Sequence, residues 1–274
     1  MQSSLVKKII RWFIPLAALA AFAGWLYIAP PGILGKADAV GYAVCHRIDE
    51  RSFHIGERQL PVCARCSGTF TAAALGLAFL ALTARKRSGM PDTKFYIPFA
   101  LFFIAFAVDG GNSYLYLLKT TSGILPQVPN LYIPNNTLRL FTGTGMGLTM
   151  AAFLFPAFNQ TAWRDPDPAP VIGTWKHFLG LLALLLVVDL LILTESPLVL
   201  YPIAFVSPLG VLLLLTIVFG MLWVMLMRQD NTFSTLRELW LPLLAGFTLT
   251  LLMILAIDLF RLQLTGTWGA FPLG

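Results

Sequence analysis

Cysteine and histidine gather in one short stretch of this 274-residue sequence. All three cysteines (Cys45, Cys63 and Cys66) and two of the three histidines (His46 and His54) lie within 22 consecutive positions. Zinc in proteins takes thiolate and imidazole ligands, and a Cys-x-x-Cys turn places two sulfurs on one ion. We therefore predict a metal site, most simply zinc and otherwise iron, with the three cysteines and His54 as ligands. His46 is the alternative fourth ligand, and otherwise orients a ligand or faces a substrate.

Two alternatives stay open for these cysteines. In the first, Cys63 and Cys66 cycle between dithiol and disulfide, and Arg65 lowers the pKa of a thiol. Membrane thiol oxidases that pass electrons to quinone generally use a second cysteine pair, whereas only Cys45 is left over here. In the second alternative, the stretch is a structural cap with inert cysteines, or it carries a structural disulfide outside the cell.

The same stretch also carries four arginines, Arg47, Arg51, Arg58 and Arg65. A guanidinium group can donate two parallel hydrogen bonds to one phosphate. Arg47 and Arg51 are therefore candidates for binding an anionic ligand or lipid head group at the membrane surface. The simpler alternative is that each arginine anchors the chain against phospholipid head groups.

Polar side chains also lie within apolar stretches further along the chain, where a charge is costly and suggests a partner or a function. Asp109 and Arg139 are predicted to form an ion pair between neighbouring helices. Together with His46 they are our candidate catalytic residues. Asn112 and Asn136 are expected to line the same polar pocket, beneath the cysteine-containing loop, and to contribute to ligand binding.

The elements that position these residues are predicted to be membrane-spanning helices. Hydrophobic residues make up 57% of the chain and charged residues only 12%, about half the charged fraction of a soluble domain. An open strand edge cannot face hydrocarbon, so the expected fold is an all-α polytopic helical bundle. Seven apolar stretches approach the ~20 residues that cross a bilayer. They are residues 10–29, 68–84, 95–118, 138–158, 177–195, 200–227 and 237–260.

The predicted spans divide into two units. An N-terminal unit, residues 1–160, contains four spans and the Cys/His loop 32–67, and a C-terminal unit, 171–274, contains three. A stiff Pro/Asp connector at 165–170 separates them. With the N-terminus in the cytoplasm, eleven of the 19 lysines and arginines lie inside and eight outside. This bias predicts a multi-pass protein of the cell membrane with a non-cytoplasmic Cys/His loop. Because the basic residues lie near span ends, the net charge of +6 indicates lipid contact rather than nucleic-acid binding.

Two further patterns concern packing between and within the helices. Gly143 and Gly147 form a G-x-x-x-G pattern in the fourth predicted span, which predicts close helix–helix packing rather than a phosphate-binding loop. Asp258 and Arg261 lie one helical turn apart near the end of the last span, where they are expected to pair locally.

The loop and the next three spans resemble a family of predicted prokaryotic membrane proteins known as domain of unknown function 2085. The matching pieces are Cys45-His46-Arg47, Arg51-Ser52-Phe53, Pro61-Val62-Cys63-x-Arg65-Cys66-x-Gly68, Asp109-Gly110 and Asn136-x-x-Arg139-x-x-Thr142-Gly143. They cover roughly residues 41–148. Asp49 stands where the family has proline, and Asn112 stands near a position where the family often has glutamine. The resemblance implies a shared core of the loop and spans two to four, and it implies no activity.

Three classes of function are consistent with these features. One is a membrane metalloenzyme or thiol redox enzyme that acts on a lipid-like substrate. Another is a transporter, for which the buried carboxylates Asp109, Asp189 and Asp258 offer a sparse polar path. The last is an assembly or accessory protein in which the metal has a structural role.

Overall fold

The structure is a computed structural model, and it describes residues 4–269. Its α-helices are α1 (Ser4–Ile28), α2 (Gly32–Val44), α3 (Ala64–Thr83), α4 (Tyr96–Ser122), α5 (Asn136–Ala162), α6 (Trp175–Ile192), α7 (Pro197–Leu226) and α8 (Trp240–Thr265). Two 3-10 helices are η1 (Asp49–Arg51) and η2 (Thr93–Phe95). Four short strands are β1 (His54–Ile55), β2 (Arg58–Gln59), β3 (Arg87–Gly89) and β4 (Asp167–Pro170). The predicted all-α fold is confirmed.

Seven helices of the described chain are long and apolar enough to cross a membrane, as predicted. They are α1, α3, α4 with the preceding η2, α5, α6, α7 and α8. The second span begins at Ala64, four residues earlier than the apolar run suggested. The polar residues of its first turn, including Arg65 and Cys66, are therefore helical, because a helix continues past the apolar run at its end.

The segment before the second span is more ordered than the predicted loop 32–67. Residues 32–44 form the helix α2, which is too short to cross a bilayer and packs against α7 and α8. After η1, the strands β1 and β2 pair as an antiparallel hairpin whose two-residue turn uses Gly56 at a φ of +62°. The cysteines are thus held between a helix end and a hairpin.

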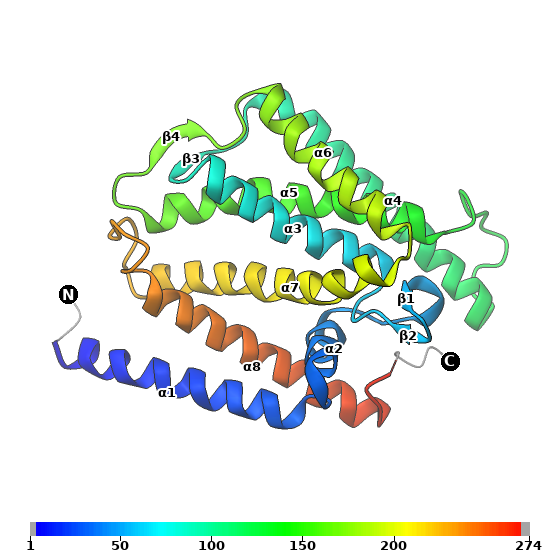
Figure 1. The fold of residues 1–274 in the computed structure, drawn as a ribbon, viewed down its shortest axis with the longest axis horizontal. Coiled ribbons are helices and arrows are strands. Elements are labelled where there is room, and N and C mark those ends of the chain that lie inside the picture. Colours follow the sequence, from blue (N-terminus) through cyan, green and yellow to red (C-terminus); the bar gives the residue numbers. More distant parts are fainter. Residues whose placement is uncertain (1–3, 270–274) are drawn as a thin grey trace.

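The spans pack around α3, which lies between α5 and α7 (Figure 1). Two glycines of α5 permit the close approach of α3: a Cβ atom on Gly143 would overlap the carbonyl of Arg65, and one on Gly147 would overlap that of Thr69. The predicted packing role of the G-x-x-x-G pattern is confirmed. One buried core fills the space between α3, α4, α5 and α6, and another joins α1, α2, α7 and α8.

The two ends of the bundle differ in what they carry. The helix α2 and the β1–β2 hairpin lie at the end where α8 finishes, and α1 starts at the opposite end (Figure 1). The parallel pair β3–β4 lies at that opposite end too. Large apolar side chains cover the outside of the spans, as in Leu19, Ile97 and Leu226, which are 65–74% exposed. Such a surface matches a hydrocarbon environment.

Candidate metal centre

The three cysteines meet where the end of α2 faces the start of α3. Cys45 is the C-cap of α2, and its N–H donates to the Gly41 carbonyl. Cys63 is the N-cap of α3, and Cys66 lies in the first turn of that helix. Gly41 lies against Pro61, and a Cβ atom there would overlap the Pro61 carbonyl. This close approach brings Cys45 to the two cysteines of α3.

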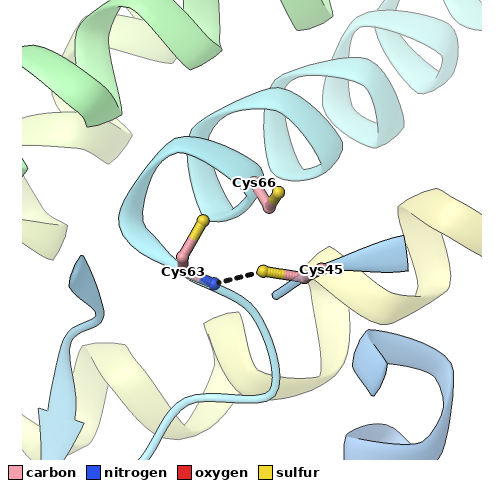
Figure 2. A group of neighbouring side chains, drawn as sticks. All are labelled: Cys45, Cys63 and Cys66. Atoms are coloured by element: carbon pink, nitrogen blue, oxygen red, sulfur yellow. Dashed lines mark hydrogen bonds between the residues drawn. The ribbon is translucent and has the colours of Figure 1, made fainter. Parts of the chain in front are cut away.

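The sulfur atoms form a compact group. The three Sγ atoms lie within 4.8 Å of one another, and all three cysteines are free thiols. Figure 2 shows Cys63 and Cys66 side by side at the start of α3, with the Cys45 sulfur directed toward the backbone nitrogen of Cys63. The Cys45 sulfur accepts hydrogen bonds from two backbone N–H groups, that of Cys63 at 3.2 Å and that of Arg47 at 3.4 Å. Backbone donors aimed at a sulfur stabilise its thiolate form.

Protonation is unequal within the group. Hydrogen bonds from Cys45 and Cys66 hold the pKa of the Cys63 thiol well below its usual range. The hydrogen bond shared with Cys63 raises the pKa of Cys45 to about 12. The Cys63 thiolate also gains from the helix N-terminus that it caps. The group therefore favours one negative charge on Cys63, shared with two neighbouring sulfurs.

The two histidines predicted as a fourth ligand do not join the sulfurs. His54 lies on β1, and its Nε2 atom lies 2.9 Å from a carboxylate oxygen of Asp49. The preceding Phe53 is buried in the core, so the alternation of a strand directs His54 to the other face. His46 is exposed beside Cys45 and is likewise outside the sulfur group. Among the described residues, the group close enough together to hold a metal ion consists of these three cysteines.

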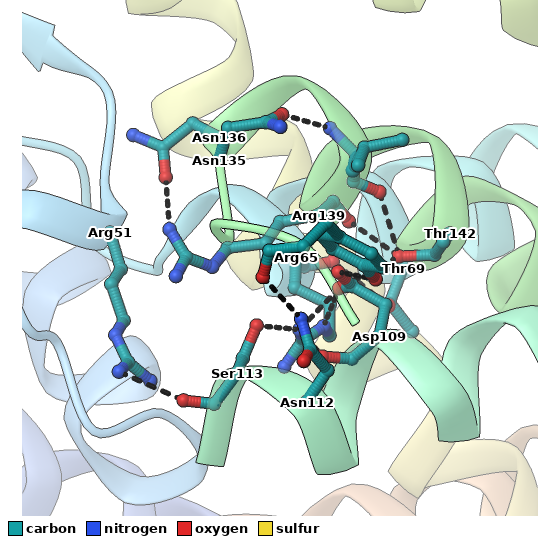
Figure 3. A network of polar contacts seen from close by, with 12 residues as sticks. Arg51, Arg65, Thr69, Asp109, Asn112, Ser113, Asn135, Asn136, Arg139 and Thr142 are labelled. Atoms are coloured by element: carbon teal, nitrogen blue, oxygen red, sulfur yellow. Dashed lines mark hydrogen bonds and ion pairs between the residues drawn. The ribbon is translucent and has the colours of Figure 1, made fainter. Parts of the chain in front are cut away.

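The predicted ion pair between Asp109 and Arg139 is not formed. Asp109 pairs with Arg65 instead. The Arg65 guanidinium forms a salt bridge with the buried Asp109 carboxylate and donates to its backbone carbonyl at 3.1 Å. Tyr132 donates to the other carboxylate oxygen, Oδ1, at 2.8 Å. The Thr142 hydroxyl lies 3.3 Å from Oδ2, the oxygen that Arg65 contacts (Figure 3). Arg65, rather than Arg139, lies next to Asp109 because the close contact of α3 with α5 places Arg65 beside α4. Asp109 is therefore the shared acceptor of the network that Arg65, Tyr132 and Thr142 form.

Asn112 and Tyr132 support this arrangement from the loop before α5. The Asn112 side chain accepts from the N–H of Leu131 at 2.9 Å and donates to the Tyr132 carbonyl at 3.0 Å. Burial, and then the bond to Asp109, raises the pKa of the Tyr132 hydroxyl to about 12. Tyr132 therefore stays protonated and donates. Tyr132 could not be identified from the sequence, because no charge or motif marks it.

Arg139 and Asn136 occupy the first turns of α5. Asn136 accepts from the Arg139 guanidinium at 2.8 Å, and it lies 3.4 Å from the carbonyls of Glu50 and Ser52. Arg139 is only 5% exposed, and its Nε atom has no hydrogen-bond partner among the described residues. The predicted polar pocket residues thus lie together near the thiols, although their partners differ from those expected.

The two arginines predicted to bind a ligand lie in different surroundings. Arg47 pairs with Asp38 of α2 at 3.0 Å, and Arg58 pairs with the same carboxylate at 2.5 Å. These bonds tie the loop to α2 and leave Arg47 apart from the Asp109 network. Arg51 faces that network and donates to the Ser113 carbonyl at 3.2 Å. Asp38 is a second residue that sequence analysis missed.

The other buried carboxylates lie away from the thiols, in α6 and α8. Thr144 donates to Asp189 at 2.8 Å. Asp258 is 1% exposed. Arg261 donates to the Cys45 carbonyl at 2.8 Å and lies over the Tyr42 ring, so it joins α8 to the end of α2. Arg261 therefore serves the contact between helices, beyond the local pairing expected from its spacing.

Comparison with known proteins places this region in a family context. Residues 45–153 match the family described as "Predicted membrane protein (DUF2085)", which confirms the resemblance seen in the motifs. The uncharacterized protein MJ1492 of Methanocaldococcus jannaschii is 28% identical over 126 residues, which are 46% of this chain and 70% of that protein. No solved structure matches the chain. The matched segment contains the three cysteines and the Asp109 network, and it ends before α6.

Proposed function

We propose that this chain is a membrane metalloenzyme whose Cys45, Cys63 and Cys66 thiolates bind one zinc ion. The supporting observation is the sulfur group itself: three Sγ atoms within 4.8 Å, with two backbone N–H groups donating to Cys45. Tetrahedral zinc–thiolate bonds of ~2.3 Å require sulfurs roughly 3.8 Å apart, which this spacing permits. Thiolates select zinc over the harder divalent ions.

A three-ligand set matters for the class of function. Structural zinc sites have four protein ligands, whereas catalytic sites have three and keep one position for water or substrate. Neither His46 nor His54 completes the set in the described chain. Bound zinc would supply a Lewis acid or an activated water at the end of a membrane bundle. Within this proposal, the substrate is a lipid-like molecule that reaches the site from the bilayer.

The metal content of the detergent-purified chain tests this proposal. We expect about one zinc per chain by elemental analysis, and its loss in the double variant Cys63→Ser, Cys66→Ser. The variant His54→Ala is the matched control, because His54 lies outside the sulfur group, and it should keep its zinc. Failure to retain zinc after reconstitution would overturn the proposal.

Thiol redox chemistry is the second candidate, and the low pKa of Cys63 at a helix N-terminus favours it. The same samples separate the two functions by counting free thiols. Metal-free protein with fewer than three free thiols per chain would indicate that Cys63 and Cys66 form a disulfide, and it would support the redox function. Metal-free protein that keeps three free thiols after exposure to a mild thiol oxidant would contradict both candidates and leave a structural role.

The contact of Gly41 with Pro61 gives a further prediction. Replacing Gly41 by alanine should force the end of α2 away from Pro61, and Cys45 should move with it. We expect zinc affinity to fall about 10- to 100-fold, as for other changes that displace a ligand from outside the coordination shell. Gly24→Ala is the control, since no atom lies within 4 Å of the added Cβ. Equal zinc affinity in the two variants, measured by competition with a chromogenic chelator, would contradict this account.

A further inference from the structure

We propose that Arg51, Arg65 and Arg139 form a binding site for a phosphate group beside Cys63. The three side chains come from η1, α3 and α5, and their guanidinium groups converge on one region (Figure 3). Arg139 is close enough to both other arginines for electrostatic repulsion among them. Burial, and then repulsion from Arg65, lowers the pKa of Arg51.

Few negative charges face these three cations. The Asp109 carboxylate already forms a salt bridge with Arg65 and accepts hydrogen bonds from Tyr132 and Thr142. Glu50 is exposed next to Arg51, and the Cys63 thiolate is a further anion that attracts Arg51 and Arg139 in the described chain. If Cys63 binds zinc together with Cys45 and Cys66, three thiolates and one Zn²⁺ carry a single net negative charge, the same as the Cys63 thiolate alone. Three guanidinium groups then face one buried carboxylate and this single charge, and such an excess of partly buried positive charge is costly unless an anion compensates it.

Arg139 has the donors to hold that anion. Its side chain is buried and donates one hydrogen bond, to Asn136, among the described residues. A guanidinium group has five N–H donors, and the Nε donor of Arg139 is buried with no partner. A buried donor without an acceptor is rare in native proteins, and it often marks a missing ligand or ion. The bonds that Arg51 makes to Ser113 and Arg65 makes to Asp109 fix their guanidinium groups around the same region.

A tetrahedral phosphate fits this arrangement better than a carboxylate. Arginine forks donate pairs of parallel hydrogen bonds to phosphate, and several forks from different directions match its several oxygens. The site also lies at the first turns of α3 and α5, near the depth of phospholipid head groups. The phosphate is therefore either a lipid head group or a free phosphate from solution. This inference rests on the proposed function, because the phosphate-bearing molecule would be the substrate of the proposed zinc centre.

Binding of two phosphate probes to the detergent-solubilised full chain tests the site. The probes are inorganic phosphate and dihexanoyl phosphatidic acid, and dihexanoyl phosphatidylcholine, which lacks a phosphomonoester, is the comparison. We expect Arg139→Gln to weaken binding of the preferred probe about tenfold to a hundredfold, since charged hydrogen bonds to a buried ion are lost. Arg139→Lys should be intermediate, because lysine keeps the charge and loses the fork. Arg85→Gln removes an exposed cation at the other end of the bundle and should bind like the wild type.

Each outcome has a distinct meaning. Binding of phosphatidic acid alone identifies a lipid head group, and equal binding of both probes identifies the phosphate itself. No binding of either probe, or equal affinity in the wild type and Arg139→Gln, overturns the site. If Arg139→Gln does not fold, the half-buried Arg51→Gln takes its place. Zinc content measured on the same samples keeps the two proposals apart, because either one can fail while the other holds.

Discussion

Replacing Asp109 by asparagine is expected to destabilise the folded chain by about 3 kcal/mol, the lower range for breaking a buried ion pair. The carboxylate is 1% exposed and the Arg65 side chain 19%, so water cannot replace the lost charge effectively. An asparagine amide would also point donor hydrogens at a cluster of donors from Arg65, Tyr132 and Thr142. The melting temperature should fall by roughly 6–12 °C.

Thermal unfolding in one detergent, followed by far-UV circular dichroism, measures this effect. Asp165→Asn is the matched control: it makes the same chemical change at an exposed connector residue, and it should leave the melting temperature unchanged. The double variant Asp109→Asn, Arg65→Gln should be more stable than Asp109→Asn alone, because the Arg65 charge is no longer left without its carboxylate partner. An Asp109→Asn variant that melts at the same temperature as the control would show that the Arg65–Asp109 pair contributes little to stability.

The spans, the sulfur group and the close packing of the glycine face of α5 could be predicted because each depends on local sequence. The length of an apolar run fixes a membrane span directly, and a Cys-x-x-Cys spacing places Cys63 and Cys66 on one turn. The glycines of α5 are likewise visible as a small-residue pattern. Cys45 could be included in the predicted sulfur group because it is the only other cysteine in the chain.

The partner of Asp109 could not be predicted, because it depends on how the helices are rotated about their axes. Arg65 lies 44 residues before Asp109, and nothing local distinguishes it from Arg139. Tyr132 reaches Asp109 only because Asn112 holds the preceding loop against α4. The position of His54 could not be predicted for a related reason: an imidazole suits a metal ligand, but the burial of Phe53 directs His54 away from the sulfurs.

Replacing Gly68 by alanine is expected to have the opposite effect from the same change at Gly180, although both residues lie within spans. At Gly180 nothing lies within 4 Å of an added Cβ, and alanine in a helix should be neutral or stabilising by ~0.5–1 kcal/mol. At Gly68 the Cβ would overlap the Leu140 carbonyl and lie 2.9 Å from the backbone nitrogen of Thr144. These atoms belong to the backbone of α5, so the helices must separate, at a cost of about 1–3 kcal/mol.

The separation should also reach both candidate sites, because α3 carries Cys63, Cys66 and Arg65 while α5 carries Arg139. We therefore expect Gly68→Ala to lower the melting temperature and to weaken phosphate binding, which needs both helices. Zinc affinity should change less, since two of the three sulfurs move together with α3. A Gly68→Ala chain as stable as Gly180→Ala would mean that α3 and α5 lie further apart than described, and the convergence of Arg65 with Arg139 would lose its basis.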